Sequence, residues 1–331
     1  MTASQMSVPA HTPSQRGVAR LLQTPLFGSV AALLVAIIVF SVITPNFLAP
    51  RNLSLVLQQS VVIGILAIAQ TLIILTAGID LSIGAITVLG TVLLAQTAGI
   101  AGPIVGLLVV LAVCIALGSV NGMLVTLLRL PPFIVTLGAF TVLVAGTRLI
   151  AGSRTFPVND PLLTLLGNSI TIGSFTTTYG VVAMFLVYLV VGYALSQTAW
   201  GKHVYAVGGN PMAAQLSGVK RHRTIFSVYA VSGVIAMIAA WAALGRIPNA
   251  DPNAYQNAGL ETITAVVIGG TSLFGGRGGV LGTLVGTLIV SVLRNGLTLA
   301  RVDNLYQNIA TGVLVIVAVA VDQFMRRKTA T

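Results

Sequence analysis

Charged residues are scarce in this sequence, and cysteine and histidine are nearly absent. Only 7% of the 331 residues are Asp, Glu, Lys or Arg, whereas a soluble globular protein carries roughly a quarter. The single cysteine, Cys114, excludes an internal disulfide and a cysteine metal cluster. The three histidines, His11, His203 and His222, have no acidic partners at ligand or relay spacing. We therefore expect no metal site, no cofactor and no acid–base catalytic site.

Apolar residues dominate instead. The hydrophobic set makes up 56% of the chain, and the mean hydropathy is +0.99. Apolar runs of about 17 to 25 residues recur along the sequence, each long enough to cross a hydrocarbon core as a helix. These features predict an all-α, polytopic membrane bundle of about ten segments. Their expected bounds are 25–43, 53–76, 81–98, 103–128, 133–151, 179–197, 224–244, 259–271, 279–296 and 305–323. The segment 259–271 is expected to be short or broken, because about thirteen residues do not span a bilayer.

The basic residues lie mainly in loops and at the chain ends. They number 17 against 6 acidic residues and give a net charge of +11. Aromatic residues are not interleaved with them, so we expect membrane orientation, not nucleic-acid binding, to be the cause. With the N-terminus inside, eleven Lys and Arg fall on the cytoplasmic side and six on the outer side. Both termini are therefore predicted to be cytoplasmic.

This topology predicts one transmembrane domain, residues 25–325, between cytoplasmic tails at 1–24 and 326–331. The basic N-terminal stretch could pass for a signal peptide, but no convincing cleavage site follows it, so the first apolar segment is interpreted as an uncleaved span. The longest polar interruption is the outer loop 152–178, which could be a solvated connection or a docking site for a partner. The second longest is the inner loop 198–224.

The inner loop contains the signals of one short helix, 211–217. Asn210 is a good N-cap, Pro211 fits the first helical position, and Gly218 can end the helix in a left-handed conformation. The side chains expected on one apolar face are Met212, Ala213, Leu216 and Val219. A helix of about seven residues is unstable alone in water, so it needs a partner surface. Both lipid headgroups and a protein groove satisfy this requirement.

A glycine-rich stretch, GGTSLFGGRGGVLGT (269–283), has part of the pattern of a nucleotide-binding loop. Gly270 and Gly275 have the Walker A spacing, but Gly276 and Arg277 stand where that loop needs Lys and then Ser or Thr. The chain is therefore not expected to bind ATP itself. The residues Gly269, Gly270, Gly275 and Gly276 are interpreted as a tight break between closely packed helices.

Residues 201–224, GKHVYAVGGNPMAAQLSGVKRHRT, resemble the cytoplasmic loop of permease subunits of bacterial ABC importers for monosaccharides. This is the ribose-type family of the branched-chain amino acid and sugar permease superfamily. Ala213 and Ala214 followed by Gly218 match the Ala-Ala-x-x-x-Gly core of its coupling helix. Three further segments are similar to that family: LTAGIDLSIGAITVLG (75–90), PPFIVTLGAFTVLVAGTRLI (131–150) and AVVIGGTSLFGGRGGVLGT (265–283).

The resemblance implies a role for the inner loop. The residues expected to couple the chain to a separate ATPase are Gly208, Gly209, Asn210, Pro211, Met212, Ala213, Ala214, Leu216 and Gly218. Two features depart from the family pattern. Met212 replaces the usual acidic residue before the Ala-Ala pair, which removes an ion pair with the ATPase. The segment 246–260 is richer in Asn than expected, which bears on the substrate.

Polar residues inside the spans are candidates for a translocation path. They are Gln58, Gln59, Gln70, Asn121, Thr136 and Thr141. Asp80, between two apolar segments, is interpreted as the cap of a helix that starts at Leu81, with Gly78 supplying the turn. Direct contact with a sugar, or with a moving proton, is the alternative role for this carboxylate.

Together these features predict a non-enzymatic transport subunit in the bacterial inner membrane. By resemblance, it would import a ribose-like pentose or a hexose, driven by an ATPase through the 210–218 helix. Its expected partners are that ATPase, a periplasmic sugar-binding protein, a second permease copy and the lipid bilayer. The alternative is a secondary transporter driven by an ion gradient, although carboxylates within the spans are scarce.

Overall fold

The computed structural model describes residues 25–173 and 175–330. In this part of the chain, eight helices are long and apolar enough to cross a membrane. They are α2 (Pro25–Ile43), α3 (Pro50–Leu75), α4 (Ile83–Ala101), α5 (Pro103–Thr126), α6 (Pro132–Ala151), α7 (Tyr179–Gln197), α10 (Arg221–Arg246) and α12 (Val280–Leu299). Several begin at a proline, which needs no hydrogen-bond acceptor at the first helical position. The expectation of an all-α membrane bundle is confirmed.

The remaining elements connect or follow these spans. They are α8 (Ala199–Gly209), α9 (Pro211–Leu216), α11 (Ala258–Ile268), α13 (Asn304–Ala330), the 3-10 turn η1 (Leu165–Gly167) and strands β1 (Phe156–Pro157), β2 (Ser169–Ile172), β3 (Phe175–Thr178) and β4 (Asn249–Ala250). Strand β1 pairs antiparallel with β4, and β2 pairs antiparallel with β3. Helix α11 has 11 residues, so this segment is short, as predicted.

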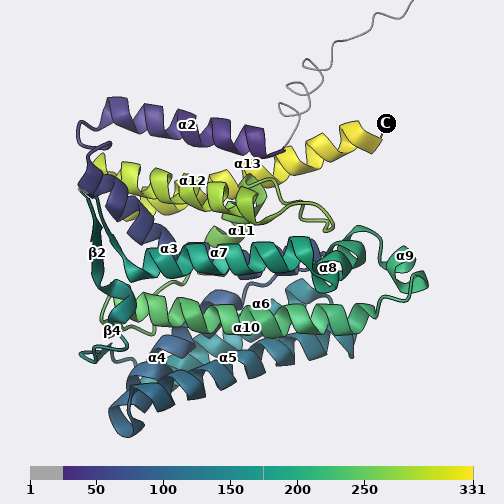
Figure 1. Cartoon of the computed structure of the whole chain (residues 1–331), viewed down its shortest axis with the longest axis horizontal. Coiled ribbons are helices and arrows are strands. Elements are labelled where there is room, and N and C mark those ends of the chain that lie inside the picture. The colour runs from purple at the N-terminus through teal and green to yellow at the C-terminus, as the bar shows by residue number, and fades with distance from the viewer. Residues whose placement is uncertain (1–24, 174, 331) are drawn as a thin grey trace, which may run out of the picture.

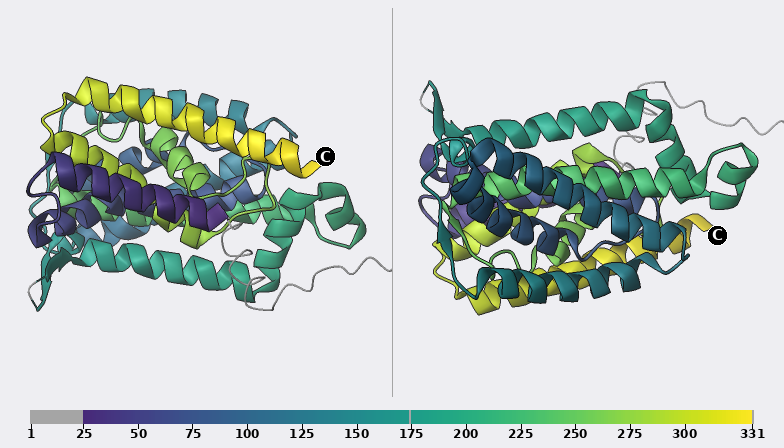
Figure 2. Two further views of the ribbon diagram at one scale, coloured as in Figure 1. Left: turned by 90° about the horizontal axis from the view of Figure 1, so that it is seen from above. Right: turned by 90° about the horizontal axis from the view of Figure 1, so that it is seen from below.

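The spans run side by side along the long axis of the molecule. The strands gather at one end, and α8 and α9 lie at the other, where α9 projects beyond the bundle (Figure 1). The start of α2 and the end of α13 both lie at the α9 end (Figures 1 and 2). The described chain therefore starts and finishes on the same side of the bundle.

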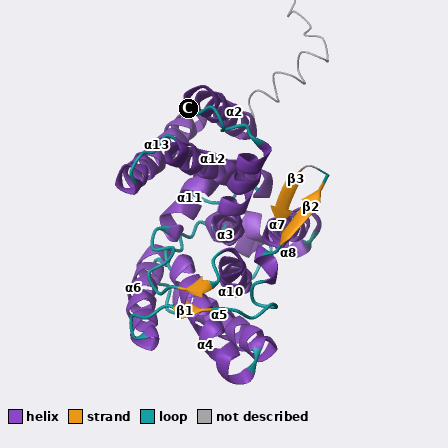
Figure 3. Cartoon of the chain, turned by 90° about the vertical axis from the view of Figure 1, so that its left-hand side faces the viewer, coloured by secondary structure: helices purple, strands orange, loops and turns teal. Residues whose placement is uncertain are grey.

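Helix α3 forms the centre of the bundle (Figure 3). In the most apolar part of α3, 83% of the residues are buried, whereas in that of α2, at the periphery, 11% are buried. Helix α10 packs against both α3 and α5. At the α5–α10 contact, a Cβ built on Gly118 would lie 2.4 Å from the carbonyl oxygen of Tyr229. Glycine is required there because the two backbones touch, which is how small residues let membrane helices pack closely.

The structure corrects several predicted boundaries. Helix α4 begins at Ile83 and not at Leu81, because Asp80, Leu81 and Ser82 form a turn before it. Helix α8 was not predicted, and the outer loop contains the β2–β3 hairpin. Helix α10 extends the predicted 224–244 segment to Arg221–Arg246, and α13 continues as far as Ala330. The predicted tail 1–24 lies outside the described residues.

Candidate functional site

Helix α9 is fixed at both ends by local hydrogen bonds. The side-chain oxygen of Asn210 accepts from the amide of Ala213 at 3.0 Å, as its predicted role as an N-cap requires. At the other end, Gly218 has a φ of 84°, and the amide of Val219 donates to the carbonyl of Ala214 at 3.0 Å. This is the glycine-terminated arrangement in which the last helical carbonyls are satisfied. The helix is therefore a short body with defined ends.

The apolar side chains of α9 point in two directions. Met212 is 70% exposed and Leu216 is 83% exposed, whereas Ala214 is buried. Val219 packs against the core and does not share the exposed face with Met212 and Leu216, so the predicted single face is wrong in this respect. Two large exposed apolar side chains at the tip of a projecting helix form a surface of the kind that a protein partner or a lipid headgroup region covers. We call Met212 and Leu216 the α9 tip.

The predicted coupling residues are divided between this tip and the interior. Pro211, Met212, Ala213 and Leu216 are exposed, whereas Gly208 and Ala214 are buried. A Cβ on Gly208 would lie 1.7 Å from the carbonyl oxygen of Leu75 and 2.7 Å from the amide nitrogen of Gly276. Gly208 therefore contacts the bundle and is not available to a partner.

Helix α8 is also attached to the bundle through Tyr205. Its hydroxyl donates to the carbonyl oxygen of Gly278 at 3.0 Å. Partial burial raises the pKa of Tyr205, so this hydroxyl stays protonated at neutral pH and remains a donor. Thus α8 contacts the glycine-rich stretch at two points.

The break between α3 and α4 is held by buried polar side chains. Asp80 Oδ1 accepts from the amide and the hydroxyl of Ser82, at 2.7 and 2.6 Å. Asn121 on α5 donates to the Ser82 hydroxyl at 2.8 Å. Thr136 on α6 donates to the carbonyl of Ile79 at 3.0 Å. With its amide oriented to suit its neighbours, Gln70 on α3 donates to the Asp80 carbonyl at 2.9 Å and accepts from the Asp80 amide at 3.2 Å.

Three of the six path candidates thus lie around one chain break. Gln70, Asn121 and Thr136 are all buried, and the hydrogen bonds above tie α3, α5 and α6 to it. Buried polar groups need such partners, since each unpaired one costs about 1–3 kcal/mol. The observed contacts of these three residues are therefore with the protein itself. We call this set, together with Asp80 and Ser82, the Asp80 network.

The other three path candidates lie elsewhere. Gln58 donates to the hydroxyl of Ser54 at 2.9 Å and lines a recess near the strand end with Arg246. Gln59 is half-buried on the same helix. Thr141 is exposed on α6, and its hydroxyl donates to the carbonyl of Leu137. The structure therefore does not bring the six candidates into one lining.

The glycine break between α11 and α12 lies beside the end of α3. Gly270, Gly275 and Gly276 have φ values of 84°, 84° and 71°, which glycine adopts without steric cost. The amide of Gly276 donates to the carbonyl of Leu75 at 3.0 Å. Gly269 packs directly on the backbone of α12. These four glycines form a tight break, and this break meets the end of α3.

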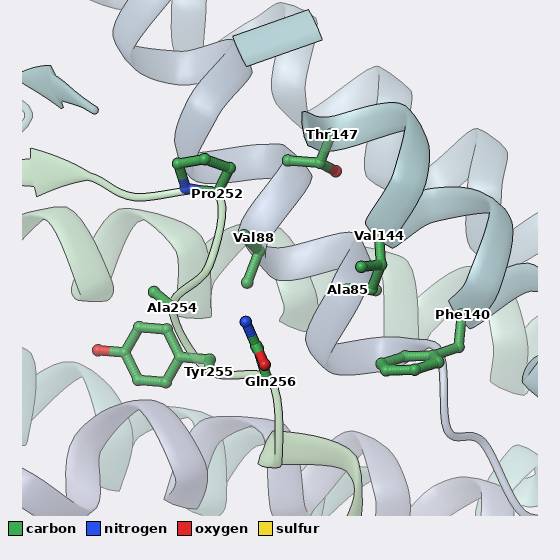
Figure 4. A pocket seen from close by; sticks show the side chains of 9 residues that line it. All are labelled: Ala85, Val88, Phe140, Val144, Thr147, Pro252, Ala254, Tyr255 and Gln256. Atoms are coloured by element: carbon green, nitrogen blue, oxygen red, sulfur yellow. The ribbon is translucent and has the colours of Figure 1, made fainter. Parts of the chain in front are cut away.

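Sequence reasoning missed the residues around a crevice between α4, α6 and the segment before α11. It is shallow, with room for little more than a water molecule, and its lining is mainly apolar. The amide of Gln256 points into it, and the Phe140 ring and Val144 lie across from it (Figure 4). The lining residues Tyr255 and Gln256 belong to the Asn-rich segment noted in the sequence. That unusual composition was the only available signal.

Comparison with known proteins identifies the family. The model of the branched-chain amino acid transport system permease component matches residues 52–319. The chain belongs to this family. A fructose import permease protein of Rhizobium meliloti is 43% identical to this permease over 94% of this chain and 88% of the relative. No solved structure matches it significantly.

Two further relatives are similar over nearly the whole chain. A ribose import permease protein of Escherichia coli K12 is 37% identical to the permease over 89% of this chain and 92% of the relative. A D-allose transport system permease protein of the same strain is 30% identical over 91% and 92%. These findings confirm the resemblance seen in the sequence. The permease is a multi-pass protein of the inner membrane and a transport subunit.

Proposed function

We propose that this permease imports a monosaccharide, a ribose-like pentose or a hexose, using ATP hydrolysed by a separate subunit. Relatives with similarity over most of the chain are named as import permeases for fructose and ribose. The observation that carries the coupling part of the proposal is the α9 tip. Its two apolar side chains are exposed on a helix with fixed ends that projects from the bundle. Such a body can occupy a groove and be moved as a unit.

In this mechanism the ATPase holds α9 in a groove on its surface. Closure of the ATPase on nucleotide displaces α9, and α8 and α10, on either side of it, carry that displacement into the spans. The translocation pathway then opens alternately to the two sides of the membrane. The permease supplies the path and the lever, and the ATPase supplies the free energy.

Three further partners complete the proposed assembly. A periplasmic sugar-binding protein would dock at the end of the bundle that carries β2 and β3. Lipid would cover the apolar side chains exposed on the outer spans, such as Val42 on α2 and Leu189 on α7. The third partner is a second copy of the permease. This part of the proposal rests on the family resemblance alone, and the mass of the purified membrane complex tests it.

Uptake by reconstituted vesicles tests the proposed function. We expect vesicles containing this permease, its co-expressed ATPase and its binding protein to accumulate one of ribose, fructose or allose when ATP is supplied on the ATPase side. The same vesicles supplied with a non-hydrolysable ATP analogue should give no accumulation. Accumulation that follows an imposed proton or sodium gradient without ATP would instead establish the secondary-transporter alternative.

Labelling of introduced cysteines tests the orientation. We propose that the α9 end is cytoplasmic, since the predicted excess of Lys and Arg lies on that side. The only native cysteine, Cys114, is buried and gives little background. In intact cells, a membrane-impermeant maleimide should label Ser153→Cys at the strand end. Ser217→Cys at the α9 end should be labelled only after the membrane is opened, and the reverse pattern would invert the topology.

A further inference from the structure

Three chain segments that are distant in sequence meet at the C-terminal end of α8. They are the end of α3 at Leu75, the last turns of α8 at Tyr205 and Gly208, and the glycine break before α12 at Gly276 and Gly278. We call these five residues the glycine junction. Each of the two breaks in the bundle begins or ends here, since the chain leaves α3 for the Asp80 network directly after Leu75.

The contacts in the glycine junction are made mainly by backbone. The amide of Gly276 donates to the Leu75 carbonyl at 3.0 Å. A Cβ on Gly208 would lie 1.7 Å from that same carbonyl oxygen. A Cβ on Gly276 would lie 2.4 Å from the Cα of Gly209. No side chain therefore separates α8 from the two breaks, and there is no rotamer change that could absorb a movement.

A side-chain hydrogen bond adds to this backbone contact. Tyr205 lies about one helical turn before Gly208, and its hydroxyl bonds to the Gly278 carbonyl on the far side of the glycine break. Gly278 itself has a φ of 130°, and a Cβ there would lie 2.3 Å from the hydroxyl oxygen of Thr271. The glycine break therefore lies between α8 on one side and Thr271, at the start of the break, on the other.

We propose that the glycine junction is the point at which movement of α9 reaches both helix breaks, with Gly208 and Tyr205 as its positioning residues. This inference rests on the proposed function. A single residue, Asn210, separates the end of α8 from the start of α9, so a displacement of α9 moves the end of α8. Because closely packed interiors transmit displacement with little compression, the end of α3 and the glycine break move with it. The junction thereby links one external lever to two separate breaks.

Two glycines near the end of α8 provide a matched pair of alanine variants. Gly208→Ala places a methyl group against the Leu75 carbonyl, whereas a Cβ on Gly279, outside the glycine junction, meets nothing closer than the hydroxyl oxygen of Tyr205 at 3.7 Å. Gly279 has an extended backbone with a φ of 174°, which alanine adopts without strain. Tyr205→Phe removes only the hydroxyl that bonds to Gly278 and keeps the ring. The three variants therefore separate the junction contacts from the effect of adding a methyl group nearby.

The experiment measures ATPase co-purification, thermal stability, ATP hydrolysis and sugar uptake for each variant in the reconstituted complex. We expect all three variants to retain the ATPase, because the α9 tip is unchanged. Gly279→Ala should keep the wild-type ratio of sugar transported to ATP hydrolysed. Gly208→Ala should lower that ratio by about tenfold, and Tyr205→Phe by about threefold, corresponding to about 1.4 and 0.6 kcal/mol of lost coupling.

The outcomes separate this inference from the proposed function. If the wild-type complex shows no ATP-driven uptake, the proposed function fails and the junction fails with it. If the wild type transports but Tyr205→Phe and Gly208→Ala keep its ratio of transport to hydrolysis, only the glycine junction is overturned. Should Gly208→Ala not fold, Tyr205→Phe decides: a lowered ratio at unchanged thermal stability supports the junction, and an unchanged ratio refutes it.

Discussion

The Leu216→Asp variant is expected to insert and fold like the wild-type permease but to bind its ATPase at least about a hundredfold more weakly, a loss of about 2.7 kcal/mol. Leu216 is 83% exposed, so a charge there disturbs few contacts within the permease. In the proposed complex the same side chain is buried in a groove, where an unpaired carboxylate is strongly unfavourable. Central apolar anchors of this kind dominate many interfaces.

Two further variants of the same helix complete this measurement. Gln215→Asp adds the same charge at the neighbouring exposed position, outside the α9 tip, and should leave ATPase binding within about threefold of wild type, since peripheral contacts contribute little. Met212→Glu places a carboxylate on the other residue of the α9 tip and should weaken binding, as Leu216→Asp does. Binding is measured by titrating purified ATPase against detergent-solubilised permease. Equal binding by Leu216→Asp and Gln215→Asp would show that the ATPase does not hold the α9 tip.

The ten expected apolar segments are all helical in the described chain, and eight of them are long and apolar enough to cross a membrane. Their positions and type could be predicted from sequence because these depend on local composition. A run of apolar residues long enough to cross the membrane identifies each span, whatever it packs against. The two ends of α9 could also be predicted from sequence, because Asn210, Pro211 and Gly218 each act on the backbone within a few residues. Such local signals do not require knowledge of the tertiary structure.

Helix α8 could not be predicted because its stability comes from tertiary contacts. Its sequence, AWGKHVYAVGG, contains three glycines, which disfavour a helix. Burial of Val204, Val207 and Gly208 against the bundle compensates. The contact of Gly208 with Leu75 could not be predicted either. A glycine indicates that another segment can approach closely, but it does not identify that segment.

The six path candidates show a different limit of sequence reasoning. A polar residue in an apolar span can line a passage or satisfy a chain break, and both roles use the same amides and hydroxyls. Gln70, Asn121 and Thr136 were selected by residue type, and the structure shows them bonded to the Asp80 break. The two roles can be distinguished only when the three-dimensional position of the chain break is known. The spacing of residues along separate helices does not give that position.

Asp80 is the residue at which these two roles predict opposite results. Its Oδ1 holds the turn before α4 through Ser82, whereas its Oδ2 and the hydroxyl of Tyr229 are both buried without a hydrogen-bond partner among the described residues. If Asp80 serves the turn, the acceptor oxygen matters and the charge does not. If it binds sugar or carries a proton, the ionisable group itself is required.

We expect Asp80→Leu to abolish folding or uptake and Asp80→Asn to retain both. Leucine removes the acceptor of both the Ser82 amide and the Ser82 hydroxyl proton in the buried turn. Each lost bond costs about 1–3 kcal/mol, which is a large part of a typical folding free energy. Asparagine keeps an oxygen that accepts from the amide and the hydroxyl of Ser82. Thermal unfolding in detergent and sugar uptake in vesicles measure the two effects.

Asp251 supplies the matched control for Asp80. Its Oδ1 accepts from the amide of Asn253, two residues later, at 2.8 Å. Asp80 makes the same contact with the amide of Ser82, but the Asp251 contact is exposed whereas the Asp80 contact is buried. Asp251→Leu should change stability by less than about 0.5 kcal/mol, because water replaces the lost contact. A folded Asp80→Asn permease that binds its ATPase but transports no sugar would contradict the structural role. The charge of Asp80 would then belong to the translocation path, and the Asp80 network would line that path and not simply hold a turn.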